Sequence, residues 1–432
     1  RYSLEVYGLG LSVCWSMDDW LSQDTVWEAL LQGDPHASIP PSDPKAYPWS
    51  KDEKGSSGSL PAYETAIKEF PEKWEIPFLL GGPDLHDPEA SDRLKEGLCG
   101  ARSSGGMHFH RFRTVTQVYG ANPDQFPADL FSLFDQYQDL PAAAIAVEDS
   151  LYLRQMLRPY DAPPLLKNGH EVPTLTGSAA VILLGRRDRV DMLRPTATEI
   201  PIREIQVPFE TCFDPDSDHV LSYDDAPPEP QQPDRRNHLR PFWEAQGGAP
   251  AAFKPSRFVK RPWCQEQLVQ FDRLKVLARL HRPQTAQYAK DGKLLGPRDR
   301  EKAFLEAWEK ALATLPKGQK PARVIYDFGP KGATHLAPLR LAIVVAGPDL
   351  DITDNDGLDV TARLRDTGAN AFYVALALGI IATEKEGGVS AVVNLRRDDC
   401  ATVLMVSPPT PEDKIRRKIH FKSDYMGTVD QE

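Results

Sequence analysis

The sequence predicts a layered α/β fold with a mixed sheet. Two observations lead to this prediction: short apolar runs of strand length recur along the chain, and segments with apolar residues at helical spacing lie between them. The chain has 432 residues, more than the roughly 250–300 that one hydrophobic core usually supports. Two α/β domains are therefore expected, at residues 1–226 and 263–432, joined by a linker at 227–262 in which 8 residues are proline.

The first domain is predicted to open with a strand at 4–13, which reads LEVYGLGLSV and is interrupted by Gly8 and Gly10. A helix over 24–32 follows and ends at Gly33. Beyond a polar loop, the remaining elements are predicted from apolar runs and from the residues that break them. They are an apolar run at 76–80, a strand at 108–119, a helix at 127–137 and a buried strand at 142–147.

The second domain is predicted to begin with two amphipathic helices. Apolar residues at helical spacing mark one helix at 265–280 and another that follows Asp299. Core packing is the favoured interpretation of both apolar stripes, and docking of a partner is the alternative. The remaining predicted elements are strands at 324–326 and 339–346, a buried helix at 372–383, and a closing strand pair at 389–395 and 401–406.

Two segments, one in each domain, echo each other. Residues 76–85 read IPFLLGGPDL and residues 341–350 read LAIVVAGPDL. Both are interpreted as a strand that ends in a Gly-Pro-Asp-Leu turn. The repeated pattern predicts two related halves.

The charge balance argues against nucleic acid as a partner. Lys and Arg total 51 against 62 Asp and Glu, so the net charge is −11, whereas nucleic-acid affinity depends on neutralising phosphates. The five cysteines are scattered and odd in number, which favours a reducing compartment, and we expect a cytoplasmic protein. Because the chain begins at Arg1, whether an upstream signal or anchor was removed is left open. Membrane contact is expected only through such a segment.

The motifs of common enzymes and cofactor sites are incomplete in this sequence. A dinucleotide loop would begin at Gly8 and Gly10, but Val13 occupies the position of its third glycine. His108 and His110 share one face of a predicted strand, yet no third metal ligand follows at a diagnostic spacing. Neither a Walker-type phosphate loop nor a serine-hydrolase elbow occurs. We therefore expect no cofactor, no metal site and no catalytic residue.

Several segments resemble β-ketoacyl synthases and other thiolase-like proteins. VYGLGL at 6–11 and WEALLQG at 27–33 are similar to the first strand and helix of that fold, and GAN at 368–370 with VVNL at 392–395 is similar to its closing helix and strand. The resemblance implies a thiolase-like fold with two related halves. Its nucleophilic cysteine would follow a buried strand, but the comparable stretch at 144–151 contains no cysteine.

The same resemblance implies two catalytic histidines in the second half, where only His335 and His420 lie beyond Arg282. Acyl transfer needs an activated thiolate with paired imidazoles. Without these groups the fold is expected to persist while the chemistry is lost. The alternative is a divergent ketosynthase-like acyltransferase that uses Ser150 or Cys99 as its nucleophile, beside His335.

The layout of the whole chain resembles a second family, the type VI secretion lipase adapters. The residues that carry this resemblance are the LEVYGLGLSV strand, VWEAL at 26–30, RVIYDFG at 323–329 and SAVVNL at 390–395. The resemblance implies a cytoplasmic, non-catalytic adapter that binds a lipase effector and loads it onto the secretion spike. The expected partners are therefore a lipase effector and a spike protein.

Four aromatic residues in or beside the proline-rich linker are candidates for partner binding: Phe242, Trp243, Phe253 and Trp263. Anchoring of the linker to its own domain is the alternative role for these side chains. A structural subunit that only self-associates is a further alternative for the whole chain.

Overall fold

A computed structural model describes residues 2–83, 112–115, 125–200, 252–254, 258–259 and 262–413, apart from residues 17–18, 33, 35, 51–54, 72–73, 75, 160–161, 164, 166, 332, 348 and 355. Most of the predicted linker at 227–262 lies outside the described residues. So do several residues singled out above, namely Cys99, His108, His110, Phe242, Trp243 and His420.

Strands and helices alternate along the chain, as the sequence predicts. The elements up to residue 200 are β1 (Leu4–Cys14), β2 (Leu21–Ser22), α1 (Gln23–Leu31), β3 (Pro48–Trp49), α2 (Ser59–Ile67), β4 (Ile76–Gly81), β5 (Phe112–Val115), α4 (Phe126–Gln136), β6 (Ala142–Asp149), α5 (Leu151–Met156), β7 (Gly169–His170), β8 (Gly177–Gly185) and α6 (Arg187–Asp191). Those from residue 265 onward are α8 (Gln265–Arg273), β9 (Ala278–Leu280), β10 (Gln284–Gln287), β11 (Ala289–Lys290), β12 (Lys293–Leu294), α9 (Pro297–Leu312), β13 (Pro321–Asp327), α10 (Ala337–Ala346), β14 (Gly357–Asp359), α11 (Val360–Leu364), α12 (Ala371–Glu386), β15 (Val389–Asn394) and β16 (Cys400–Ser407).

One mixed sheet runs through the molecule in the order β14-β13-β15-β16-β9-β1-β8-β6-β4-β5. In the first half, β1, β8 and β6 are antiparallel neighbours, and β6, β4 and β5 are parallel. The second half repeats this pattern: β9 and β10 pair with β16 and β16 with β15 in antiparallel fashion, and β15, β13 and β14 are parallel. The layered α/β class with two related halves is confirmed.

The sequence echo that suggested two halves is wrong in detail. Its first copy forms β4, but its second copy lies mostly in α10, and the strand that corresponds to β4 is β13. The strand predicted at 339–346 is therefore a helix. An apolar run alone does not distinguish a buried strand from a helix, and Pro338 suits the first turn of a helix. The helix predicted at 265–280 ends at Arg273, and β9 follows it.

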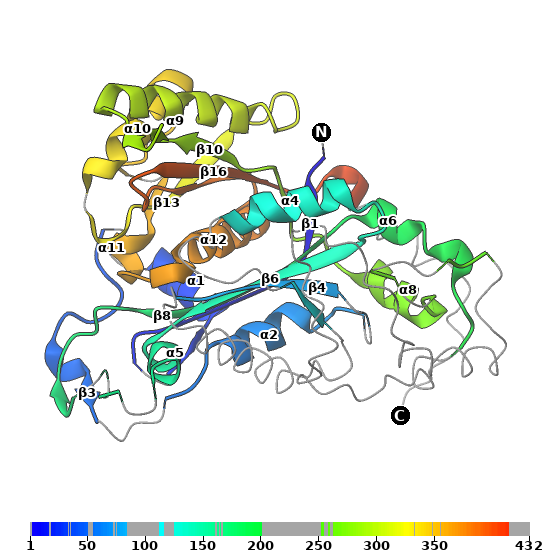
Figure 1. The fold of residues 1–432 in the computed structure, drawn as a ribbon, viewed down its shortest axis with the longest axis horizontal. Coiled ribbons are helices and arrows are strands. Elements are labelled where there is room, and N and C mark those ends of the chain that lie inside the picture. The colour runs from blue at the N-terminus through cyan, green and yellow to red at the C-terminus, as the bar shows by residue number, and fades with distance from the viewer. Residues whose placement is uncertain are drawn as a thin grey trace.

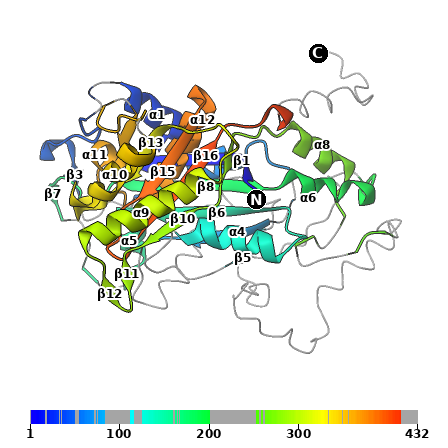
Figure 2. The same ribbon diagram turned by 90° about the horizontal axis from the view of Figure 1, so that it is seen from above.

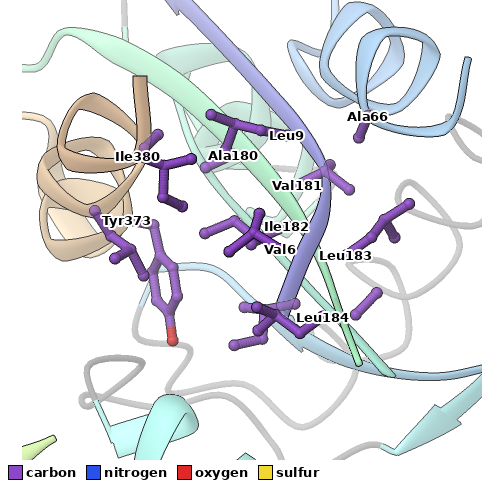
Figure 3. Packing of buried hydrophobic residues seen from close by; sticks show 14 of the residues in the cluster. Val6, Leu9, Ala66, Ala180, Val181, Ile182, Leu183, Leu184, Tyr373 and Ile380 are labelled. Carbon is purple, nitrogen blue, oxygen red and sulfur yellow. The ribbon is translucent and has the colours of Figure 1, made fainter. Parts of the chain in front are cut away.

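Helix α12 lies in the middle of the molecule, between the two halves of the sheet (Figure 1). Every residue from Ala371 to Thr383 is buried, which confirms the predicted buried helix. The helix contacts β13 and β15 of one half and β1 and β8 of the other. Figure 3 shows Tyr373 and Ile380 of α12 on one face of β1 and β8, with Ala66 of α2 on the opposite face. The first half of the sheet is thus covered by helices on both faces.

The two glycines of β1 allow helix α2 to pack directly on the strand. A Cβ atom on Gly10 would lie 1.8 Å from the Ala62 carbonyl oxygen, and one on Gly8 would lie 2.1 Å from the Ala66 carbonyl oxygen. The strand continues through both glycines from Leu4 to Cys14, and its pairing with β8 shifts register between Val6 and Gly8. Their role is close approach of a helix backbone, which only glycine permits.

Gly10→Ala is expected to lower the free energy of unfolding by about 1–3 kcal/mol, because the added methyl group forces α2 away from β1. Urea unfolding followed by circular dichroism measures this change. Gly296→Ala is the matched control, since the nearest atom to its new Cβ, Asp299 Oδ2, is 3.9 Å away. Equal loss of stability in the two variants would contradict close packing as the reason for Gly10.

His281, just after β9, is a buried histidine held in its neutral form. Its Nδ1 donates to the Thr314 carbonyl oxygen at 3.0 Å, so its Nε2 accepts from the Ser407 hydroxyl at 2.9 Å. Burial lowers the pKa of His281 from 6.5 to about 4. The imidazole of His281 therefore binds a proton more tightly in the unfolded chain than in the folded chain. The stability that comes from this difference is present above pH 6.5 and is lost as the pH falls from 6.5 to 4.

We expect the free energy of unfolding to fall by up to about 3 kcal/mol more in the wild type than in His281→Gln between pH 7 and pH 4, because glutamine cannot take up this proton. Urea midpoints measured across this range test the difference. Parallel pH profiles for the two proteins would show that His281 is not held neutral by the fold.

Candidate functional site

The carboxyl ends of three strands converge beside the N-terminus of α12. In α/β proteins, ligands usually bind at the carboxyl ends of the strands. Here β6 ends in Asp149, β13 in Asp327 and β15 in Asn394, and all three side chains are buried. We take this region as the candidate functional site and call it the strand-end cluster.

Asp149 ties the first half of the cluster together. Its two carboxylate oxygens accept hydrogen bonds from Arg154 Nε at 2.7 Å and from the second guanidinium nitrogen at 2.8 Å. The backbone N–H of Ala369, just before α12, also donates to Asp149 Oδ2 at 2.8 Å. Asp149 is fully buried, so this pairing satisfies a charge that would otherwise be costly inside the protein.

Arg396 ties the second half together. Its guanidinium pairs with the carboxylates of Asp327 and Asp366 and donates to the Gly368 carbonyl oxygen at 2.9 Å. Burial lowers the pKa of Arg396, but the two carboxylates outweigh burial and hold the pKa above its ordinary value. The Thr361 hydroxyl also donates to Asp327. Asp149 and Arg396, from opposite halves, therefore hold the same short segment before α12.

That segment contains two residues with left-handed backbone. Gly368 has a φ of +61°, and a Cβ there would lie 2.1 Å from Asp149 Oδ2, so glycine is required. Arg365 has a φ of +65°, which is strained for a residue with a side chain. Its guanidinium offsets that strain by donating to the carbonyl oxygens of Pro40 and Pro41 at 3.2 and 2.5 Å. The segment thereby anchors the loop after α1.

Glu148, next to Asp149, points to the other face of β6 and has its own set of partners. It accepts hydrogen bonds from the hydroxyls of Ser57 and Ser59, from the Gly58 N–H, and from the Ser150 hydroxyl at 3.2 Å. Burial raises the pKa of Glu148, and these hydrogen bonds oppose the increase. The carboxylate of Glu148 thus binds the residues at the start of α2 and holds them in place.

The residues proposed for an acyltransferase have structural partners. Ser150 caps α5 by accepting from the Leu153 N–H at 3.0 Å, and it donates to Glu148. His335 Nδ1 donates to the Leu395 carbonyl oxygen at 3.1 Å, and its Nε2 lies 3.7 Å from Asp398. No hydrogen bond joins Ser150 to His335 in the described part of the chain, and Cys99 lies outside that part.

The described cysteines are Cys14, Cys264 and Cys400, and all three are buried. Burial raises the pKa of Cys14 and of Cys264, which favours the thiol over the nucleophilic thiolate. Among the described residues, no group of three His, Cys, Asp or Glu side chains is placed to hold a metal ion.

The four predicted partner-binding aromatics are placed only in part. Phe253 is half-buried. Trp263 is buried, and its ring meets Trp74 edge-on at 4.4 Å and Phe271 at 6.0 Å between centroids. Trp263 therefore anchors its segment to the core, which is the alternative role considered for it. Phe242 and Trp243 lie outside the described residues, and partner binding by these four residues stays a prediction.

Sequence reasoning missed the residues of the strand-end cluster. A signal for two of them was present, because Asp327 directly follows the apolar run at 324–326 and Asp149 lies two positions beyond the apolar run at 142–147. Their partners could not be found in this way: Asp149 and Ala369 are 220 positions apart, and Arg396 and Asp327 are 69 apart.

The fold and the cluster together define a layered α/β protein with two topologically equivalent halves, which meet at their strand ends through the hydrogen bond from the Ala369 N–H to the buried Asp149. Family models match both halves: the N-terminal model of the type VI lipase adapter protein Tla3 matches residues 2–168, and the C-terminal model of the same protein matches residues 277–408. The chain belongs to this type VI lipase adapter family.

Solved structures show a distant likeness. The oxazolomycin ketosynthase domain OzmH KS8 of Streptomyces albus is 10% identical, with 95% of this chain and 96% of that chain covered and a TM-score of 0.46. OleA of Xanthomonas campestris is 12% identical, with 94% and 98% covered and a TM-score of 0.40. At this identity the likeness concerns the fold alone.

The longest described helices, α9 and α12, have 16 residues each. Within the described residues, then, no helix combines the length and the apolar character that crossing a bilayer requires.

Arg396→Gln is expected to lower the free energy of unfolding by about 3–5 kcal/mol, because it leaves the buried Asp327 carboxylate unpaired. Thermal and urea unfolding measure the loss. Lys320→Gln is the control, since it removes an ion pair with Asp349 in which both side chains are 71% exposed, and it should leave the midpoints nearly unchanged. Similar midpoints for the two variants would mean that the ion pairs of Arg396 do not stabilise the fold.

Proposed function

We propose that this protein is a non-catalytic adapter that binds a lipase effector and loads it onto the spike of the type VI secretion system. The observation that carries the proposal is the match to both family models, which together span about two thirds of the chain. A family of lipase adapters implies protein partners, and the effector and a spike protein are the partners we propose. We place the protein in the cytoplasm, where an effector would be collected before secretion.

The strand-end cluster supports a non-catalytic role. Each charged group described there has a partner within the chain: Asp149 pairs with Arg154, and Arg396 pairs with Asp327 and Asp366. A catalytic carboxylate or base must reach a substrate and must be able to accept or donate a proton. The buried charged groups of the strand-end cluster are already paired with other residues, so their role is structural.

The proposed partner contacts include the linker aromatics. We propose two domains, at 1–226 and 263–432, with the proline-rich linker between them presenting Phe242, Trp243 and Phe253 to a partner. Aromatic side chains are common energetic anchors at interfaces because they bury a large rigid surface. Trp263 would contribute by fixing the end of the linker to the core.

One observation favours the alternative, a divergent acyltransferase. Thr176 Oγ1, Thr367 Oγ1 and Asn370 Oδ1 are buried near the N-terminus of α12 and have no hydrogen-bond partner in the described chain. Polar atoms of this kind, beside the positive end of a helix, can bind a small polar group. They lack a nucleophile paired with a base, so the adapter remains the better-supported proposal.

Tagged wild-type protein is expected to retain both a candidate lipase effector and a spike protein in co-purification, because an adapter must hold its cargo and its carrier. A tagged, unrelated acidic protein of similar size is the control for nonspecific capture. Retention of neither partner above that control would refute the adapter proposal.

The purified chain is expected to acquire no stoichiometric covalent acyl group from acyl-CoA or acyl carrier protein donors, as measured by intact-mass spectrometry. A β-ketoacyl synthase labelled in parallel is the positive control. A stoichiometric adduct on Ser150 or Cys99 would establish the acyltransferase alternative.

A further inference from the structure

Helix α10 is apolar on both of its faces. Its inner face packs into the second half of the core through Pro338, Leu339, Ala342 and Ile343. Its outer face carries Leu341, Val344 and Val345, whose side chains are 36%, 72% and 53% exposed. Spacings of three and four residues place these three side chains together on one surface of the helix. We call them the α10 outer face.

The neighbouring helix shows what an ordinary solvent face looks like in this protein. α9 lies beside α10 in the outer layer (Figures 1 and 2) and exposes Lys302, Glu306, Glu309 and Lys310. A surface helix normally has such a polar side, and a helix that is apolar all round is normally buried. Other exposed large apolar residues, such as Leu31, Met192 and Val269, occur singly, which is common on protein surfaces.

The charge of α10 narrows the choice of partner. Arg340 is the helix's sole charged residue, it is exposed, and it makes no ion pair with another described residue. A partner that covers this helix therefore needs aliphatic or aromatic side chains for the outer face and a carboxylate for Arg340. A symmetric dimer centred on α10 fits less well, because α10 carries no carboxylate that could pair with Arg340 of a second copy.

We infer that the α10 outer face binds the lipase effector, through an apolar segment of the effector that carries an Asp or Glu opposite Arg340. This inference rests on the proposed adapter function and adds to it the surface and the chemistry of the contact. The outer face acts as an energetic anchor within a wider contact, since a few buried apolar residues supply most of the affinity of typical interfaces.

The double variant Val344→Asp with Val345→Asp tests the outer face. It should weaken effector binding at least about 10-fold in biolayer interferometry, because two carboxylates must then be buried in an apolar contact. Its unfolding midpoint should match the wild type, since both side chains are largely exposed. Val269→Asp on α8 is the matched control: it makes the same change at a 47% exposed helical position, at the far side of the molecule from α10 in both views (Figures 1 and 2).

The outcomes separate the two proposals. If the wild type does not bind the effector, the adapter function fails. If the wild type and the double variant bind with equal affinity, the adapter function stands and the α10 inference is overturned.

The charge of Arg340 is tested separately. Arg340→Glu should also weaken effector binding several-fold, while Arg340→Lys should not. Equal binding by these two variants would show that the effector places no carboxylate opposite Arg340.

Cysteine labelling tests whether the face is free before the effector arrives. Val344→Cys should react with a maleimide in the free protein, above the background of the unsubstituted chain, and should be protected when the effector is bound. Val269→Cys should react in both states. If Val344→Cys is unreactive in the free protein, another segment or a second copy already covers α10, and the inference is overturned.

Discussion

The architecture depends on the burial of α12. A helix with thirteen consecutive buried residues, from Ala371 to Thr383, has no face that can be left to water. Sheet halves on both sides supply the apolar cover that such a helix needs, with β13 and β15 on one side and β1 and β8 on the other. The two halves must therefore face each other across α12. The pairing of β9 with both β1 and β16 then keeps the halves in one hydrogen-bonded sheet.

Burial of α12 also explains the strand-end cluster. The N-terminus of the helix lies deep in the protein, so the segment that leads into it must enter through polar groups that need partners of their own. Asp149 satisfies the N–H of Ala369, and Arg396 satisfies the carbonyl oxygen of Gly368. Each residue comes from a different half of the sheet. Charged groups at the strand ends, where α/β proteins usually bind ligands, thus hold the segment that leads into α12, and Asp149 holds it from the other half of the sheet.

The sequence predicted the elements whose burial is uniform. β1, β15 and β16 are buried along their whole length and α12 from Ala371 to Thr383, and because these segments are predominantly apolar their pattern indicates them without knowledge of the fold. Contacts between distant residues could not be predicted. Arg363 donates to the carbonyl oxygens of Leu30 and Ala37, more than 320 positions away, and no local pattern marks such an arginine. The role of Gly8 and Gly10 was likewise hidden, because it depends on where α2 packs.

The strand predicted at 339–346 is in fact helix α10, and the apolar composition that caused this wrong prediction also supports the role inferred for α10. The sequence predicts a strand at 339–346 because nearly every side chain there is apolar, and uniform apolarity predicts cover on all sides. α12 has that cover from two sheet halves, whereas α10 is covered on its inner face and leaves Val344 and Val345 exposed. The composition of α10 is that of a helix buried on all sides, but the described chain covers only its inner face. The exposed outer face is the surface that the inferred contact with the effector would cover.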